Sequence, residues 1–488
     1  MIDLPSLSVT WTLVVLLLTL LCIYGVWPHG FFKKLGIPGP RPWPFFGTFL
    51  SYTKGFCNFD MECAKKYGKV WGIYDGRLPI LMVTDLEMIK AIMVKECYST
   101  FTNRRVSLAG PFADGITVVK DERWKRIRSS LSPYFTSGRL KEIFPIAVTH
   151  ADRFIKNMQK RDHEQPVKVK EVVAPYSLDV VTSSSFSVDI DSINNADDPF
   201  VTNIKKFFKF SLFSPLILIL GGRVDFLKLM IQNQIPDEKF EDTSDQPVKG
   251  LRDSTEFTHY RLFHFKCDYG VFINLIGLTD HEILSQSFVF ILGGYETTST
   301  TLTYLLYNLA TNPDCLEKLV LEIDTNFPPD TPITYDALMK MDCLEMAINE
   351  SMRLLPTAPR LERVCKKTVE LNGVTIPKDT LVGIPTYVLC RDLQLWESPD
   401  EFRPERFSPE CKSEMNQYAF MPFGLGPRNC IGMRFAQMIM KLLVVKLLQN
   451  FSMETCKETQ IPLELNAIFQ PKVPITLKFI PRSCKAKE

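Results

Sequence analysis

The chain has 488 residues and a net charge of +2, from 57 Lys and Arg against 55 Asp and Glu, so it supplies no global field that would hold a polyanion. Hydrophobic residues make up 45% and charged residues 23%, which suits a large core and excludes an intrinsically disordered chain. The 13 cysteines are an odd number without a C-x-x-C pair, which fits neither a disulfide framework nor a structural zinc site. We therefore expect a globular body in a reducing compartment, with no nucleic-acid partner.

The N-terminal segment is long and apolar enough to cross a bilayer as a helix. No charged side chain lies between Leu4 and Pro28. A cleaved signal peptide, the alternative, would have a basic start, a shorter apolar region and a small-x-small cleavage site, whereas this segment begins with Asp3. Lys33 and Lys34 follow the span, and the positive-inside tendency then places the body in the cytosol. We expect a membrane anchor over residues 1–30.

A proline-rich connector separates this anchor from the body. The stretch Ile37-Pro38-Gly39-Pro40-Arg41-Pro42-Trp43-Pro44 has fixed φ angles and few amide donors, which prevents a helix and favours a stiff, extended chain. We expect a hinge over residues 31–48 that sets the orientation of the body at the membrane surface. Residues 49–488 contain no internal repeat, so they are expected to form one large domain.

The body begins with the pattern of a β-hairpin and continues mainly with helical periodicity. Val70 to Tyr74 and Pro79 to Val83 are apolar runs on either side of the turn signal Asp75-Gly76. A helix is expected over residues 85–96, and short extended pieces over 374–376 and 381–387. The predicted fold class is therefore mainly α with small β-sheets.

A long central helix is expected from Thr279, which opens a capping-box pattern with Glu282, to the sequence Thr311-Asn312-Pro313, where proline should end it. Its middle contains Gly293-Gly294-Tyr295-Glu296-Thr297-Thr298. Each glycine there destabilises a helix by roughly 1 kcal/mol relative to alanine, so the break needs a reason. Two remain open: close packing of another helix, or a groove where the backbone approaches a ligand.

A glycine-rich loop near the C-terminus leads a cysteine to the start of a helix. It reads Phe423-Gly424-Leu425-Gly426-Pro427-Arg428-Asn429-Cys430-Ile431-Gly432 and precedes a helix-periodic run. At a helix N-terminus the unpaired amides and the dipole lower the pKa of a thiol, so we expect thiolate character at Cys430. The glycines would let the backbone approach a flat, bulky partner. A buried structural cysteine in a glycine-rich turn is the alternative.

Phe423-x-x-Gly426-x-Arg428-x-Cys430-x-Gly432 resembles the haem-thiolate loop of the cytochrome P450 superfamily, with Cys430 matching the proximal iron ligand. The resemblance implies the cytochrome P450 fold, preceded here by a single N-terminal transmembrane helix, and haem b (iron protoporphyrin IX) as cofactor. Glu350-x-x-Arg353 is similar to another motif of the family, and Arg406 would complete a salt-bridged triad with them.

Further residues match positions that hold haem in the family. Trp124 and Arg128, four residues apart on an expected helix, match residues that bind a haem propionate. By the same resemblance the other cofactor-binding residues are Arg104, Arg363, Phe423 and Arg428. Cations at these positions suit the haem carboxylates.

The resemblance extends to vertebrate family 3, subfamily A, through segments such as Phe101-Thr102-Asn103-Arg104-Arg105 and Arg360-Leu361-Glu362-Arg363-Val364. It implies an endoplasmic-reticulum monooxygenase that hydroxylates lipophilic steroids, drugs and other xenobiotics, with electrons from NADPH through NADPH-cytochrome P450 reductase and in some reactions cytochrome b5. Thr297, with Glu296 beside it, would stabilise bound oxygen and deliver protons to it. The substrate pocket would be lined by Ile116, Thr117, Val289, Leu292, Gly293, Thr297, Ala358, Arg360 and Glu362.

Two departures from the subfamily pattern bear on activity. Leu292 and Gly293 stand where the subfamily usually has Phe and Ala, which should enlarge the space near the iron. Residues 221–277 are shorter than the family's pocket roof and largely unlike it. A catalytically impaired haem-binding isoform is therefore one alternative. An oxygen-independent haem-thiolate isomerase is another, although the acid–alcohol pair Glu296-Thr297 argues against it.

Overall fold

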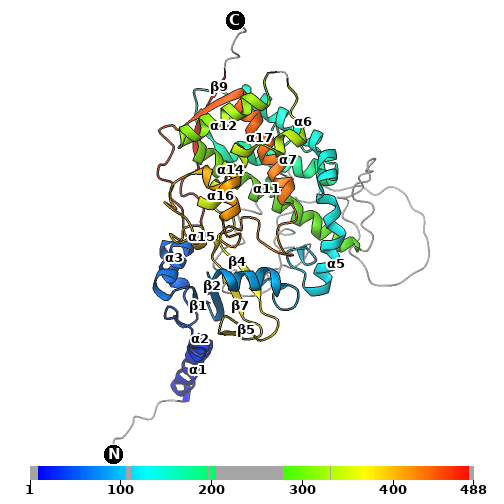
Figure 1. The fold of residues 1–488 in the computed structure, drawn as a ribbon. Coiled ribbons are helices and arrows are strands. Elements are labelled where there is room, and N and C mark those ends of the chain that lie inside the picture. The colour runs from blue at the N-terminus through cyan, green and yellow to red at the C-terminus, as the bar shows by residue number, and fades with distance from the viewer. Residues whose placement is uncertain are drawn as a thin grey trace, which may run out of the picture.

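A computed structural model describes residues 9–105, 112–195, 198, 201–204, 278–329 and 331–482 of the chain (Figure 1). Within these ranges helices dominate, and the strands form small sheets. The mainly α fold class predicted from the sequence is confirmed. The atypical segment 221–277 lies outside the described residues.

The N-terminal helix α1 (Val9–Val26) extends from the body toward the N-terminus (Figure 1). Within the described ranges, one helical stretch, Thr10–Lys34, is long and apolar enough to cross a membrane, and only 6% of its most apolar window is buried. After α1 the chain passes through η1 (Trp27–Gly30) and α2 (Phe31–Lys34) into the body. Phe32 is buried against Gly72, where an added Cβ would lie 2.2 Å from its ring.

A four-stranded sheet lies beside this entry point, in the order β1 (Val70–Asp75), β2 (Leu78–Val83), β7 (Leu381–Ile384) and β4 (Leu361–Val364). The predicted hairpin is confirmed, with Val70 opposite Val83 and Asp75 opposite Leu78. The extended piece expected over 381–387 was too long. It ends at Ile384 because Pro385 has no amide donor for the ladder, and α15 (Thr386–Leu389) follows.

Two smaller sheets complete the β-structure of the described chain. One has the order β3 (Val167–Lys168), β9 (Thr476–Pro481) and β8 (Phe451–Glu454), and the other pairs β5 (Val369–Leu371) with β6 (Val374–Ile376). The β6 strand is the extended piece expected over 374–376.

The helices of the body pack around one large hydrophobic cluster, to which α6, α7, α11, α12, α14 and α17 all contribute. At its centre α17 has buried positions from Met438 to Leu448, and the Tyr176 hydroxyl of α7 donates to the Ile439 carbonyl oxygen at 3.0 Å. The helices not yet given bounds are α3 (Phe56–Tyr67), α4 (Leu86–Lys90), α5 (Asp121–Leu131), α6 (Ser137–Gln159), α7 (Val169–Phe186), α11 (Asp280–Ala310), α12 (Pro313–Asn326), α13 (Tyr335–Met339), α14 (Asp342–Leu354), α16 (Pro409–Glu414) and α17 (Met433–Asn450). Short 3-10 helices are η2 (Phe49–Lys54), η5 (Ser132–Phe135) and η6 (Pro404–Phe407), and η3 (Ala91–Lys95) is a π-turn that extends α4 over the helix expected at 85–96.

The long helix predicted through the middle of the domain is α11. Its capping box is present, because Thr279 accepts a hydrogen bond from the Glu282 amide and Glu282 accepts one from the Thr279 amide. The helix ends at Ala310, three residues before Pro313, as the sequence predicts. It packs along α7, and both helices cross the core near α17 (Figure 1).

Candidate active site

The cysteine loop holds Cys430 at the entrance to α17 through backbone contacts. The Cys430 amide donates to the Phe423 carbonyl oxygen at 2.8 Å, which closes the loop. Gly424 and Gly426 have φ angles of 70° and 69°, a region that suits glycine. A side chain at Gly426 would also place its Cβ 2.0 Å from the Met93 carbonyl oxygen. The loop therefore needs glycine at 426 for both its conformation and its packing.

The pKa of Cys430 differs from the sequence-based prediction. The thiol is solvent-accessible, yet protein surrounds it on most sides, and the resulting desolvation raises its pKa above the ordinary value. The Gly432 amide and the guanidinium groups of Arg128 and Arg104 act in the opposite direction without offsetting it. The predicted effect of the helix N-terminus is present, because the Gly432 amide lowers the pKa of Cys430, but desolvation outweighs it. A coordinating metal ion would deprotonate this thiol outright.

Four arginines gather beside this loop from distant parts of the chain. Arg104 donates to the Arg428 carbonyl oxygen at 2.9 Å, and Arg128 donates to the carbonyl and side-chain oxygens of Asn429 at 2.9 and 2.8 Å. Arg428 reaches back to the Val119 carbonyl oxygen at 3.0 Å. All these acceptors are neutral, so the arginines are brought together without carboxylate partners.

The charges of this arginine cluster, defined as Arg104, Arg128, Arg363 and Arg428, are not compensated by the described protein. None of the four is within salt-bridge distance of a described carboxylate. Burial, followed by repulsion from Arg104, lowers the pKa of both Arg363 and Arg428 to about 9. Two guanidinium nitrogens of Arg363 and one of Arg428 are buried without a hydrogen-bond partner. Such buried, unpaired cations are costly unless an anion completes them.

The tryptophan predicted to assist these cations lies among them. Trp124 is 2% exposed on α5, and the guanidinium carbon of Arg428 lies 4.6 Å from the centre of its ring. Arg128 stands one turn later on the same helix. Phe423 is partly buried and packs against the main hydrophobic cluster. Its carbonyl oxygen accepts the hydrogen bond from the Cys430 amide.

The two glycines in α11 have different surroundings, which resolves the two alternatives left open by the sequence. A Cβ at Gly294 would lie 2.5 Å from a methyl carbon of Val181, so Gly294 permits the close packing of α7. A Cβ at Gly293 would meet no atom within 4 Å. Thr297, exposed and one turn later, donates its hydroxyl to the Gly293 carbonyl oxygen. Gly293 and Thr297 thus share the open face of the helix.

Glu296 lies on the neighbouring face of α11, away from that opening. Its carboxylate forms an ion pair with Lys170 of α7 and accepts a hydrogen bond from the Thr300 hydroxyl at 3.4 Å. Lys170 could not be identified from the sequence, because a lysine 126 positions away from Glu296 carries no local signal. The acid and the alcohol are adjacent in sequence but point to different neighbours.

The three residues expected to form a salt-bridged triad are together and deeply buried. Glu350 and Arg353, both 0% exposed, form an ion pair at 2.7 Å, and Arg406 lies 3.3 Å from the Glu350 carboxylate. Arg353 also donates to the carbonyl oxygens of Cys390 and Pro399, each at 2.7 Å. This cluster joins α14 to η6 and to the segment that precedes the cysteine loop.

The residues expected to line a substrate pocket fall into two groups. Ile116 and Val289 belong to one hydrophobic cluster, and the Ile116 amide donates to the Gln286 side chain at 2.7 Å. Thr117 adjoins Ile116, Leu292 adjoins the opening at Gly293, and Ala358 is exposed, with its carbonyl oxygen accepting from Thr386 at 2.6 Å. The placement of this first group is compatible with a shared lining.

The second group consists of Arg360 and Glu362, whose charged ends are engaged by the N-terminal elements. Arg360 donates twice to the buried Asp60 of α3, at 2.6 Å each. Glu362 pairs with Arg105 at 2.7 Å. Their role as pocket residues stays a prediction, since neither charge is free.

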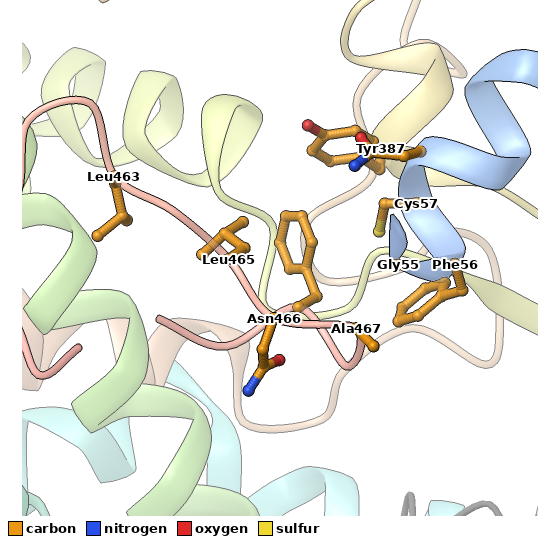
Figure 2. Close-up of a pocket in the computed structure, with 10 residues that line it drawn as sticks. Gly55, Phe56, Cys57, Tyr387, Leu463, Leu465, Asn466 and Ala467 are labelled. Carbon is orange, nitrogen blue, oxygen red and sulfur yellow. The ribbon is translucent and has the colours of Figure 1, made fainter. Parts of the chain in front are cut away.

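A cavity of about 180 Å³ lies between the start of α3, α15 and a C-terminal loop (Figure 2). Its lining residues are Gly55, Phe56, Cys57, Asn58, Tyr387, Leu463, Leu465, Asn466, Ala467 and Phe469. It includes none of the residues predicted to bind haem or substrate. The chemistry described above is instead carried by the cysteine loop and the arginine cluster.

Together these features define a haem-thiolate protein. Among the described residues no group of three or more His, Cys, Asp or Glu side chains could hold a metal ion, so an ion at Cys430 needs its other ligands from a cofactor. Haem would supply four such ligands, and its two propionates would supply anions for Arg363 and Arg428. The residues present therefore fit this group.

Comparison with known proteins agrees with this class. The family model for cytochrome P450 matches residues 37–479. The chain is 49% identical to cytochrome P450 3A40 of Oryzias latipes over an alignment 523 positions long, which covers 98% of each chain. It is 52% identical to cytochrome P450 3A30 of Fundulus heteroclitus, covering 97% of this chain and 98% of the relative, and 49% identical to cytochrome P450 3A12 of Canis lupus familiaris, covering 98% of each.

The chain belongs to the cytochrome P450 family. Membership carries the haem-thiolate cofactor and the monooxygenase class of oxidoreductase.

Proposed function

We propose that this chain is a membrane-anchored monooxygenase that hydroxylates lipophilic compounds, including steroids, drugs and other xenobiotics. The observation that carries the proposal is the meeting of the Cys430 loop with four arginines that have no carboxylate partner. Only a large ligand with a metal and anionic groups satisfies both at once. The relatives named above support the substrate class by their similarity over nearly the whole chain.

In this proposal each site residue has a defined task toward haem. Cys430 would supply the thiolate ligand, and Gly426 keeps the loop close to η3 so that the sulfur is held in place. Arg104, Arg128, Arg363 and Arg428 bind the propionates, with Trp124 supporting Arg428. Bound in this way, haem supplies reductive activation of O₂ for insertion of one oxygen atom into a C–H bond.

The open face of α11 provides the distal side of the site. Gly293 would leave space for oxygen and substrate, and the Thr297 hydroxyl, which donates to the Gly293 carbonyl oxygen, would be available to donate a proton on this face. Glu296 pairs with Lys170 and accepts a hydrogen bond from Thr300, so it would pass protons toward Thr297 only after its carboxylate turns away from Lys170. Ile116, Thr117, Val289, Leu292 and Ala358 would form the apolar lining, bordered by Arg360 and Glu362.

The proposed location is the endoplasmic-reticulum membrane, with the body in the cytosol. Helix α1 supports a single-pass anchor over residues 1–30, followed by the connector 31–48 and the catalytic domain 49–488. Electrons would come from NADPH through NADPH-cytochrome P450 reductase, with cytochrome b5 as a second possible donor. A cytosolic domain is accessible to both.

The first experiment is the reduced, CO-bound difference spectrum of the full chain expressed in membranes. A strongly red-shifted Soret band is expected, and Cys430→Ser should remove it. Cys411→Ser is the matched control, since Cys411 is exposed on α16 away from the loop, and it should keep the band. An unshifted band in the wild type would contradict the thiolate assignment.

Turnover is tested next with purified reductase, NADPH and a panel of steroids. Hydroxylated product is the expected result. A correct CO spectrum without any product would instead support the impaired isoform, and rearranged product formed without O₂ would support the isomerase.

A further inference from the structure

The end of the anchor helix is packed against the body rather than separated from it. A Cβ at Gly25 would lie 2.7 Å from the ring of Phe45, so the helix backbone and this ring are in direct contact. The Phe45 amide donates to the Gly25 carbonyl oxygen at 3.3 Å, and the Tyr24 and Phe45 ring centres are 6.5 Å apart. The connector segment therefore folds back onto the helix that it follows.

A second set of contacts fixes the chain just after the anchor. The His29 ring lies 3.1 Å from the Gly76 carbonyl oxygen, at the tip of the β1–β2 hairpin. The Tyr74 hydroxyl donates to the His29 carbonyl oxygen at 3.0 Å and accepts from the Phe32 amide at 3.2 Å. Together with Gly25 and Phe45 these residues form the anchor–body joint, which holds α1 at a defined angle to the hairpin (Figure 1).

Arg77, at the same hairpin tip, is a cation without an anion. Its guanidinium carbon lies 3.5 Å from the centre of the Tyr24 ring. Its Nε is buried without a hydrogen-bond partner, and no described carboxylate lies within salt-bridge distance. The nearest acid in sequence, Asp75, is occupied, since it accepts from Arg105 at 2.8 Å and from Tyr52 at 3.2 Å.

The depth of this cation in a membrane follows from the length of the anchor. The 18 residues of α1 extend about 27 Å at 1.5 Å per residue, close to the thickness of the hydrocarbon core. Tyr24 stands two residues before the end of α1, so its ring and Arg77 lie where the lipid phosphates begin.

Exposed apolar side chains near the joint suit the same depth. Trp27 is 81% exposed, Trp43 60% and Leu78, the neighbour of Arg77, 39%. Tryptophan is enriched at membrane interfaces because its ring is amphipathic. In water these side chains would be unfavourable, whereas at the interface they would be solvated by lipid.

We propose that Arg77 binds the phosphate of a membrane phospholipid while it stacks on Tyr24, and that this bound lipid fixes the tilt of the body on the bilayer. The proposal rests on the membrane anchor proposed above and is independent of the monooxygenase reaction. A phosphate oxygen would complete the guanidinium of Arg77 in the way that the Glu350 carboxylate completes Arg353.

The test uses the full-length holoprotein in bilayer nanodiscs, with the tilt of the haem plane measured by linear dichroism of oriented samples. In phosphatidylcholine, Arg77→Met should shift the tilt angle or broaden its distribution, because methionine keeps an apolar stem but cannot bind phosphate. Arg41→Met, which removes an exposed cation from the nearby connector 31–48, is the matched control and should leave the tilt unchanged.

Bilayers of digalactosyldiacylglycerol, which contain no phosphate, provide the second arm. There the wild type should show the tilt of Arg77→Met, and the variant should show no further change. Equal tilt of variant and wild type in phosphatidylcholine would overturn the proposal. So would an Arg77→Met effect of the same size in the galactolipid, since Arg77 would then act on Tyr24 alone. Loss of the protein from the bilayer after an alkaline wash would instead refute the anchor, and a missing red-shifted CO band would refute the haem site.

Discussion

Two groups of buried arginines lie within the same domain and have opposite surroundings. Arg353 has 0% exposed surface, and its charge is matched by Glu350 and by several carbonyl oxygens. Arg363 is equally buried at 1% exposure, yet two of its nitrogens have no partner. A complete set of partners indicates a structural cation, and an incomplete set indicates a cation that is kept for a ligand.

The same distinction applies to the two glycines of α11. Gly294 is in contact with Val181, so its missing side chain is used for packing within the protein. A Cβ at Gly293 would meet no atom of the described residues within 4 Å, so its missing side chain is not used for packing among them. Polar and apolar groups thus separate into those satisfied by the fold and those left for a partner.

The largest expected effect comes from Glu350→Gln, which breaks the buried cluster of Glu350, Arg353 and Arg406. Removing one charge of a buried ion pair leaves Arg353 uncompensated, which should lower the free energy of unfolding by about 3–5 kcal/mol. Since a domain is stable by roughly 5–15 kcal/mol, this loss would remove a large share of the stability, and the yield of folded protein should fall. Urea unfolding monitored by circular dichroism, and the yield of haem protein, measure this loss.

The control is the exposed ion pair between Lys318 and Glu405, whose atoms are 2.8 Å apart. Glu405→Gln should change the unfolding free energy by less than about 1 kcal/mol, because exposed pairs contribute little. Equal losses from Glu350→Gln and Glu405→Gln would contradict the structural role of the buried cluster.

In the arginine cluster, Arg363→Met should change the stability of the haem-free protein in the opposite sense. Removing a buried, unpaired cation should make the haem-free protein more stable, while haem should dissociate about 10- to 100-fold more readily, as expected from a lost charged hydrogen bond of about 1.5–3 kcal/mol. Haem transfer to apomyoglobin measures the dissociation rate, and urea unfolding of the apoprotein measures the stability. A destabilised apoprotein with unchanged haem retention would show that Arg363 is structural.

A smaller effect is expected from the paired variants Gly294→Ala and Gly293→Ala. The first places a methyl group 2.5 Å from Val181 and should lower the unfolding free energy by about 1–3 kcal/mol. The second meets no atom and should raise it by up to about 1 kcal/mol, because alanine is the better helix former. Thermal unfolding of the two apoproteins compares them directly. Equal destabilisation by both would mean that Gly293 is also a packing glycine.

Much of this organisation is readable from local sequence. The hairpin follows from Asp75-Gly76 between two apolar runs, the limits of α11 follow from Thr279 and Pro313, and the loop around Cys430 follows from its glycines. These features depend on neighbouring residues and on backbone preferences. The strand expected over 381–387 ends at Ile384, because Pro385 has no amide donor for the sheet.

The buried polar groups that have no partner within the described protein could not be identified from the sequence. Arg353 and Arg363 are both arginines on regular elements, and only the three-dimensional structure shows which one has partners. The raised pKa of Cys430 depends on its burial in the folded protein, which the local sequence does not show. Arg77 stacks on Tyr24, which lies 53 positions away in the chain, so the local sequence does not indicate this contact either.

The smallest change in stability is expected from Lys170→Met. This variant tests whether Lys170 positions Glu296 for proton delivery or only stabilises the fold. The pair with Glu296 is partly exposed, so its loss should alter the unfolding free energy by less than about 1 kcal/mol. Without Lys170 the Glu296 carboxylate is free to turn toward Thr297, and proton supply to the distal side should change. The product formed per NADPH consumed, and the solvent isotope effect on it, measure that change. Lys168→Met, which removes the exposed partner of Glu171 near the start of the same helix, should leave both unaltered. Identical coupling in all three proteins would show that Glu296 acts only as a surface-side ion pair, and that Thr297 receives its protons by another path.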